Sequence, residues 1–282
     1  MLVEESTILA ILSRIHAAKA DFSLTMIKRA VQLLLERVRQ PEALLPPWNW
    51  PFGMGMVVMY LVVLLAALLF TASLADAPMD EAFEPDIFAR ANLIGCLLVG
   101  VLIYQYITTA FYKAQENKQI HQNLRPVEVL HLTPSENTPL AFVALIAFTI
   151  VIVTDVIGFI VGVPSDSLPR PLLGLKEGSS EFLVGVLVVV AARPIVEEII
   201  FRGILYPALR KQFQPFLSIG LSALAFVVLH ILLDSDLWWG GIYPLVLGIT
   251  AGIARASTKS TQSAIIAHVM FGLFMMLRAI IL

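Results

Sequence analysis

Two adjacent glutamates, Glu197 and Glu198, lie inside the apolar stretch FLVGVLVVVAARPIVEEIIF, which is long enough to span a membrane as a helix. A charged side chain at bilayer depth costs about 2.5–3.5 kcal/mol on insertion scales, so a pair of carboxylates there indicates a function. Two later apolar stretches carry one histidine each, His230 and His268. One carboxylate and two imidazoles on separate helices are the parts of a polar site buried in lipid. They suit proton transfer, and with an open fourth position they would also suit a catalytic zinc ion.

The two glutamates are expected to have different roles. Consecutive helical residues point about 100° apart, so Glu197 and Glu198 should not both face one cavity. Glu198 and Arg202 are four residues apart in the acid-before-base order that favours an ion pair on one helix face. We therefore give Glu198 a structural role and leave Glu197 for chemistry. Arg193 could also pair with Glu197, and the alternative that all these charges only hold helices in register stays open.

The composition indicates an integral membrane protein. Of the 282 residues, 58% are hydrophobic and 14% are charged, against ~45–50% and about 25% in soluble domains. The formal net charge of −2 argues against a nucleic-acid partner, which would need a basic face. Cys96 is the single cysteine, which excludes a disulfide framework and a paired-cysteine metal site. We expect it to be a small buried hydrophobe.

The elements that must position the site are membrane-spanning helices. The pattern predicts an all-α, polytopic transmembrane helical bundle of about seven spans. These lie near residues 52–75, 91–112, 139–163, 181–203, 215–233, 240–256 and 261–282. Basic residues gather in 113–138, 202–211 and 255–259, whereas 76–90 is acidic. The positive-inside rule then predicts a cytosolic N-terminus and an external C-terminus, with the lipid bilayer as the surrounding partner.

Three regions are expected along the chain. Residues 1–47 predict a cytosolic amphipathic helical segment, because apolar residues recur there at helical spacing with basic residues between them. Residues 48–138 would form the N-terminal transmembrane helices and loops, beginning with Trp48 and Trp50 as interfacial anchors. Residues 139–282 would form the transmembrane core that carries the candidate site.

Three short motifs follow one another, each on its own apolar segment. Glu-Glu-x-x-x-Arg begins at Glu197, Phe-x-x-x-His joins Phe226 to His230, and His268 begins a third motif of the type His-x-x-x-Asn/Asp. In this order they resemble the CPBP family of intramembrane proteases, the CAAX-prenyl-processing endopeptidases and bacteriocin-processing relatives. The resemblance covers roughly residues 180–275.

The resemblance implies hydrolysis of a peptide bond within the membrane or at its cytosolic face. In such enzymes the glutamate at Glu197 and the histidine at His230 activate a water molecule, and the histidine at His268 stabilises the oxyanion together with an asparagine. Phe226, Glu198 and Arg202 would support them. The substrate would be a peptide or a lipidated protein, and the location the bacterial inner (cytoplasmic) membrane.

One position departs from the family pattern. Gly272 stands where the third motif has asparagine or aspartate, so one donor of the oxyanion hole is missing. Losing such a donor typically costs about 10²–10³ in rate. Gly272 therefore favours an alternative, a weak or inactive relative that acts as a scaffold or immunity protein. A proton-coupled transporter that uses Asp155 with Glu197 in a relay is a second alternative.

The cofactor is open at this stage. The family has been described both as metalloproteases and as metal-free glutamyl proteases. No His-Glu-x-x-His motif is present, and the candidate ligands come from three helices. We expect no metal, with zinc as the alternative.

Depth is a further open point. At 1.5 Å per residue, Glu197 and His268 lie roughly 10 Å from the cytosolic ends of their predicted helices, and His230 about 20 Å from its own. The three side chains meet only if the helix of His230 is tilted or begins below the interface, or if residues 203–216 dip inward.

Overall fold

The structure is a computed structural model that describes residues 25–78, 84–121, 123–162, 180–234 and 241–281. The chain divides into two compact units, residues 1–40 and residues 41–282. In the first unit, residues 25–39 form a helix. The helical spacing expected before residue 25 falls outside the described residues. The predicted division of the remainder at residue 138 stays a prediction.

All regular elements of the described residues are helical, which confirms the predicted all-α class. The long helices are α2 (Trp50–Leu74), α3 (Pro85–Glu116), α5 (Leu140–Ile160), α10 (Pro215–Asp234), α11 (Ile242–Thr258) and α12 (Thr261–Ile281). Five of them, α2, α3, α5, α10 and α12, are long and apolar enough to cross a membrane. The count of about seven spans stays a prediction.

The candidate site is carried by a broken helix over residues 180–209. Its pieces are α7 (Ser180–Leu187), η2 (Val188–Ala192), α8 (Arg193–Glu198), η3 (Ile199–Leu205) and α9 (Tyr206–Leu209), where η2 and η3 are π-helical. Each π segment ends two residues before a proline, Pro194 or Pro207. A proline lacks the backbone N–H and crowds the carbonyl of the preceding turn, and a π turn makes room for it. The broken helix therefore runs six residues beyond the predicted end at 203.

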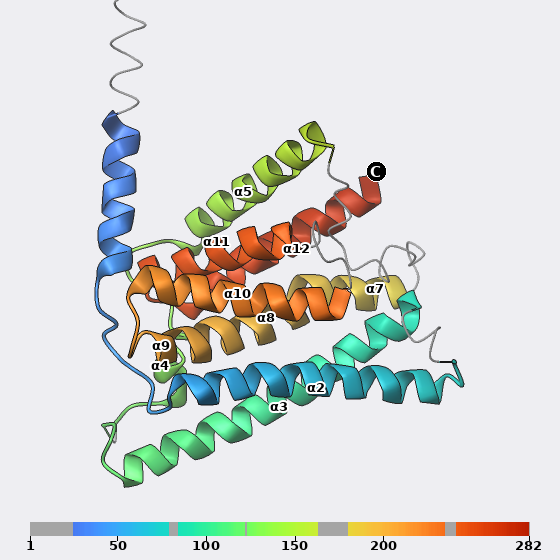
Figure 1. The fold of residues 1–282 in the computed structure, drawn as a ribbon, viewed down its shortest axis with the longest axis horizontal. Helices are drawn as coiled ribbons and strands as arrows, with labels where there is room; N and C mark the ends of the chain where they lie inside the picture. Colours follow the sequence, from blue (N-terminus) through green and yellow to red (C-terminus); the bar gives the residue numbers. More distant parts are fainter. Residues whose placement is uncertain (1–24, 79–83, 122, 163–179, 235–240, 282) are drawn as a thin grey trace, which may run out of the picture. The chain divides into compact units, whose positions relative to one another are not determined.

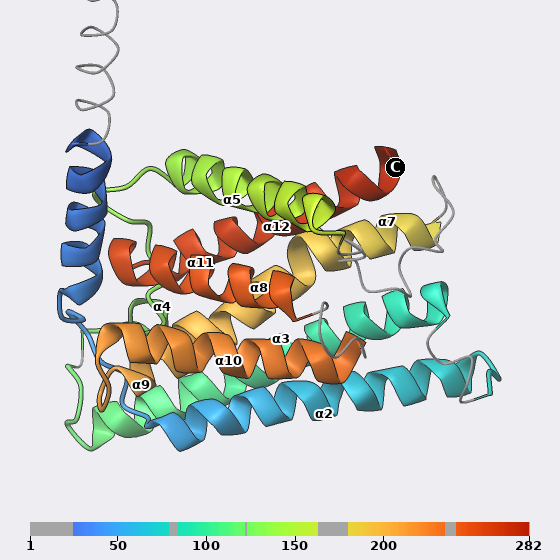
Figure 2. The ribbon, with the colours of Figure 1, turned by 45° about the horizontal axis from the view of Figure 1, so that its top comes forward.

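The helices α2, α3, α10, α11 and α12 pack around this broken helix, and α5 packs on α11 and α12 (Figures 1 and 2). α2 lies along α3, α10 lies along α11, and α12 contacts both α11 and α5. The broken helix contacts α2 and α3 through some of its turns and α12 through others. It therefore lies between the first two long helices and the last one, so its side chains can meet residues from both ends of the chain.

The surface of α5 shows why the chain is an integral membrane protein. Only Val143, Ala147 and Val151 are buried, four residues apart along one stripe. Most of the other residues of α5 are apolar and exposed or partly exposed, with Phe159 81% exposed. A soluble helix carries polar residues outside such a stripe, whereas an apolar exterior suits lipid.

Near the other end of α5, Asp155 has two partners that the sequence did not indicate. Tyr243 Oη donates a 2.6 Å hydrogen bond to Asp155 Oδ1, and Arg278 Nη1 lies 3.2 Å from the same oxygen. These contacts join α5 to α11 and α12. An intramembrane acid is thus paired rather than exposed to lipid.

The first turn of α12 is covered by the loop that follows α4 (Pro126–Val129). Thr261 donates its backbone N–H to His131 O at 2.7 Å and its hydroxyl to Leu130 O at 2.7 Å. Gln262 donates to Leu132 O, and Thr261 is fully buried. These bonds satisfy donors at the helix N-terminus, and they show that α12 begins beneath a layer of chain.

The structure also places three residues for which the sequence predicted a location in the core or at the membrane interface. Cys96 is buried, as predicted. Trp48 is also buried, and its Nε1 donates a 3.2 Å hydrogen bond to Ile204 O, within η3. The prediction that Trp48 is an interfacial anchor is therefore wrong, because its indole N–H bonds a carbonyl of the broken helix. Trp50 is exposed.

Candidate active site

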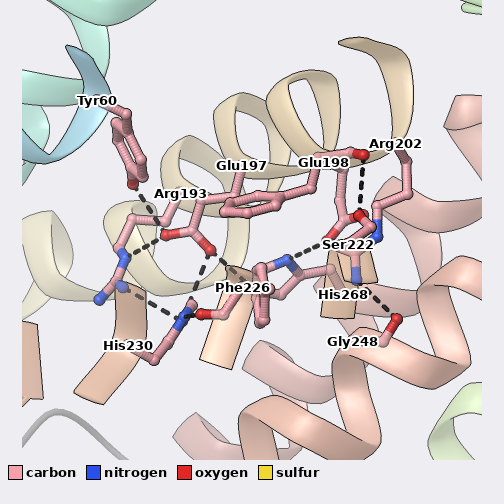
Figure 3. Close-up of polar contacts among 11 residues, drawn as sticks. Tyr60, Arg193, Glu197, Glu198, Arg202, Ser222, Phe226, His230, Gly248 and His268 are labelled. Carbon is pink, nitrogen blue, oxygen red and sulfur yellow. Dashed lines mark hydrogen bonds and ion pairs between the residues drawn. The ribbon is translucent and has the colours of Figure 1, made fainter. Parts of the chain in front are cut away.

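The glutamate and the two histidines singled out in the sequence come together (Figure 3). Glu197 Oε2 lies 3.7 Å from His230 Nε2 and 3.9 Å from His268 Nε2. Glu197 is fully buried, and both imidazoles are more than four-fifths buried. Three separate helices, α8, α10 and α12, contribute these side chains.

The helix ends show how far along its own helix each of the three side chains lies. Because the broken helix continues to Leu209, Glu197 lies twelve residues from that end, about 18 Å along the axis. His230 lies fifteen residues from the start of α10, about 22 Å along its axis. His268 lies seven residues from the start of α12, about 10 Å along its axis, and that first turn is itself covered by the loop after α4.

The two carboxylate oxygens of Glu197 have different surroundings. Oε1 accepts a 2.8 Å hydrogen bond from Arg193 Nε and a 2.9 Å hydrogen bond from Tyr60 Oη. Oε2 accepts no hydrogen bond from the described residues. One oxygen is thus held in place, and the other faces the two imidazoles.

Glu198 lies in the same cluster. Its Oε1 accepts from Arg202 Nη1 at 2.9 Å and lies 2.9 Å from His268 Nδ1. Arg202 also donates to Gly248 O at 2.7 Å, which ties the pair to α11. The i,i+4 pair expected from the sequence is therefore present.

Both glutamates contact the same imidazole, and the expectation that they do not face one cavity stays a prediction. The His268 ring lies between them, with Nδ1 near Glu198 and Nε2 near Glu197. Although the two glutamates point about 100° apart around the helix axis, their side chains are long enough to reach Nδ1 and Nε2 of one imidazole ring.

Hydrogen bonds fix the orientation of both rings. His230 Nδ1 lies 3.0 Å from Phe226 O, and since a carbonyl only accepts, Nδ1 carries the proton and the neutral ring presents a lone pair at Nε2. His268 Nδ1 donates to the Glu198 carboxylate in the same way. When the His268 ring is protonated, its Nε2–H becomes a donor that points toward Glu197.

Phe226 packs both rings. Its ring centroid lies 4.2 Å from that of His230 and 5.6 Å from that of His268, the second in an edge-to-face arrangement. The Arg202 guanidinium carbon lies 4.9 Å from the Phe226 centroid, within the range of a cation–π contact. The phenylalanine of the second motif thus restricts the positions of three polar side chains.

Gly272 lies where α12 approaches the broken helix most closely. A Cβ at position 272 would come well inside 3.0 Å of Val189 O, a separation that Cβ atoms essentially never show, and 3.2 Å from Val189 C. The neighbour is backbone and cannot swing away. An asparagine side chain therefore has no room here, and the place of the motif residue is taken by the η2 backbone.

These side chains are a poor fit for zinc. Arg193 Nη2 lies 3.4 Å from His230 Nε2, the nitrogen that would bind the metal, so a guanidinium charge would face the cation. Among the described residues, no group of three His, Cys, Asp or Glu side chains is arranged to hold a metal ion. Both imidazoles donate their Nδ1 hydrogens, to Phe226 O and to Glu198, and this arrangement is common to acid–base sites and metal sites.

A comparison with protein families supports the resemblance read from the motifs. Residues 179–274 match the family model described as Rce1-like, type II CAAX prenyl endopeptidase. That segment is similar to the Rce1-like endopeptidases. The Rce1-like segment contains all three motifs, including Glu197, His230 and His268, and it agrees with the CPBP family expected from them. No curated protein and no solved structure matches the chain.

Two residues of the cluster were missed or left open by the sequence. Tyr60 is fully buried on α2 and lies 137 positions before the glutamate that it contacts. No local pattern marks a tyrosine in an apolar helix as a partner of a distant acid. Arg193 could be found from its i,i+4 spacing to Glu197, but its contact with His230 depends on how α10 packs.

Proposed function

We propose that the protein is an intramembrane endopeptidase of the CAAX-processing type, which cleaves a peptide or lipidated protein in the membrane. One observation carries the proposal: Glu197 Oε2 faces His230 Nε2 and His268 Nε2 at 3.7 and 3.9 Å, while Oε1 is held by two donors. Such separations are too long for direct hydrogen bonds and suit a bridging water about 2.8 Å from each atom.

The reaction follows from the state of each side chain. Glu197 Oε2 takes one proton from the bridging water, and the other hydrogen of the water stays on its oxygen and forms a hydrogen bond to His230 Nε2. The water oxygen attacks the scissile carbonyl carbon, and His268, protonated on Nε2, donates to the oxyanion. The C–N bond then breaks, and Glu197 returns the proton to the leaving amine. Water is the only co-reactant consumed.

We test this with the purified protein in liposomes, incubated with a farnesylated CAAX peptide and with an unprenylated hydrophobic peptide, and cleavage is followed by mass spectrometry. We expect Glu197→Gln to abolish cleavage of whichever peptide is cut. The matched control is Asp155→Asn, which breaks another intramembrane ion pair and should leave cleavage within about threefold. Activity that persists in Glu197→Gln would refute the endopeptidase proposal.

The same variants separate the alternatives. A proton-coupled transporter that uses Asp155 in a relay would lose function in Asp155→Asn as well. The tight approach at Gly272 favours a weak enzyme or a peptide-binding scaffold. Binding of the peptide without cleavage by the wild-type protein, unaffected by Glu197→Gln, would support the scaffold.

We further propose that the protein lies in the bacterial cytoplasmic membrane with its N-terminus in the cytosol. The basic loops support this orientation. Single cysteines introduced at Lys118 and at Asp76 in a Cys96→Ala background should be labelled from opposite sides by a membrane-impermeant maleimide. Labelling of both from one side would refute the orientation.

A further inference from the structure

We propose that Arg193 is a positioning residue of this site: its guanidinium holds the Glu197 carboxylate and the His230 ring toward one shared water. The inference rests on the proposed function and adds a residue to it. Arg193 lies outside the three motifs, and the site expected from the sequence assigns it no part in the reaction.

The contacts of Arg193 reach both members of the water-activating pair. Nε donates to Glu197 Oε1 at 2.8 Å, and Nη2 lies 3.4 Å from His230 Nε2. Arg193 is 5% exposed, so these contacts form away from solvent, where electrostatic interactions are strong. One planar group therefore joins α8 to α10 at the reacting atoms.

The direction of each contact matters for the chemistry. Because Nε and Tyr60 Oη both bind Oε1 of Glu197, the carboxylate cannot rotate freely, and Oε2 stays toward the imidazoles. Because His230 Nδ1 donates to Phe226 O, Nε2 is an acceptor, and Nη2 approaches its lone-pair side. At 3.4 Å the Nη2 contact is long, which leaves that lone pair within reach of a water hydrogen.

Gly272 allows the turn that precedes Arg193 to approach α12 closely. The broken helix approaches α12 closely at Val189, one turn before Arg193, and any side chain at 272 would push that turn away. The same helix face carries Arg193 and Glu197, which are one turn apart and bonded to each other. The chain thus has glycine instead of asparagine in the third motif, and the Arg193 guanidinium of the broken helix contacts the Glu197 carboxylate and the His230 ring.

A purely structural ion pair is the competing explanation, and the substitution of lysine distinguishes it. Lysine keeps the charge and can pair with Glu197, but a point-like ammonium cannot also reach His230. A structural role predicts that Arg193→Lys retains kcat, whereas positioning predicts a loss.

The experiment measures kcat, KM and thermal stability for Arg193→Lys and Arg193→Ala with the peptide that the wild type cleaves. We expect kcat to fall about tenfold in Arg193→Lys and about 10²-fold in Arg193→Ala, with KM changed less than threefold, because a misplacement near 1 Å costs about that much. Ethylguanidinium added to Arg193→Ala should raise the kcat of that variant at least tenfold. The matched control is Arg278→Ala, which removes a remote intramembrane guanidinium and should show neither the kcat loss nor the rescue.

The outcomes separate this inference from the proposed function. If Glu197→Gln abolishes cleavage but Arg193→Lys keeps the wild-type kcat, the positioning role is wrong and the endopeptidase stands. If Glu197→Gln cleaves normally, the proposed function fails first. Should Arg193→Ala not fold, Arg193→Lys alone decides, since it preserves the charge in the buried cluster.

Discussion

Substitution of asparagine at Gly272 gives the sharpest test of the geometry. The family pattern alone predicts that Gly272→Asn supplies the missing oxyanion donor and raises the rate by about 10²–10³. The packing predicts the opposite, because the added Cβ would meet the carbonyl of Val189 on the η2 backbone. The family pattern thus predicts a faster enzyme and the packing predicts a slower one.

The magnitude follows from the approach at Val189. Ordinary contact for a Cβ begins at 3.4 Å, so the backbone at Val189 must retreat by roughly 1 Å, a displacement that costs about 10²-fold in rate when it reaches the reacting groups. Overpacking of this kind also costs typically 1–3 kcal/mol of stability. We therefore expect Gly272→Asn to lose about 10² in kcat and to melt at a lower temperature than the wild type.

The assay is peptide cleavage in liposomes together with thermal unfolding in detergent. Gly220→Asn is the matched control, since a Cβ at Gly220 in α10 meets nothing within 4 Å. That variant should keep both activity and melting temperature. A Gly272→Asn protein with raised kcat and undiminished stability would refute the reasoning about the Val189 contact.

Three further predictions concern the site and its surroundings. Tyr60→Phe removes one of the two donors to Glu197 Oε1, so kcat should fall about tenfold with the melting temperature little changed; an unchanged kcat would exclude a role for the hydroxyl. Cleavage should survive EDTA and phenanthroline, because a guanidinium faces the nitrogen that zinc would need; activity lost to chelation and restored by zinc would contradict this. The free energy of unfolding should fall as the pH drops from 7 to 4. Burial, and then the charge of Arg255, lower the pKa of His131 in the folded protein to about 4. The unfolded chain therefore binds a proton first, which lowers the free energy of unfolding by up to about 3 kcal/mol. Burial opposes ionisation of Glu42, but the charges of Arg255, Lys259 and His131 together with the hydrogen bond from Arg255 outweigh it and keep the pKa of Glu42 low, so the contribution of Glu42 to stability is lost at still lower pH. His131→Gln should flatten the dependence of the melting temperature on pH above pH 4.5.

The sequence predicts the identities of the central residues better than their contacts. Glu197, His230 and His268 are recognisable because charged or polar residues in apolar helices are costly, so each one stands out. The i,i+4 pair of Glu198 and Arg202 follows from helix geometry alone. The all-helical fold likewise follows from apolar stretches of spanning length.

The features that escaped prediction depend on how helices meet. The basic residues near 202–211 suggested that the broken helix ends near 203, but it continues through η3 to Leu209, and this extension is what aligns Glu197 with His230. The consequence of Gly272 required the position of the Val189 carbonyl, which no spacing rule supplies. The approach of Tyr60 depends on packing between segments far apart in the chain.

The hydroxyl of Tyr60 has a consequence for how the molecule can be divided. The family match begins at residue 179, yet a ligand of the central carboxylate comes from α2, more than a hundred positions upstream. A truncated chain or a chimera cut at the edge of the match would leave that carboxylate with one donor instead of two. The smallest fragment that keeps the complete site therefore includes α2. The functional unit is thus longer than the segment that matches the family model.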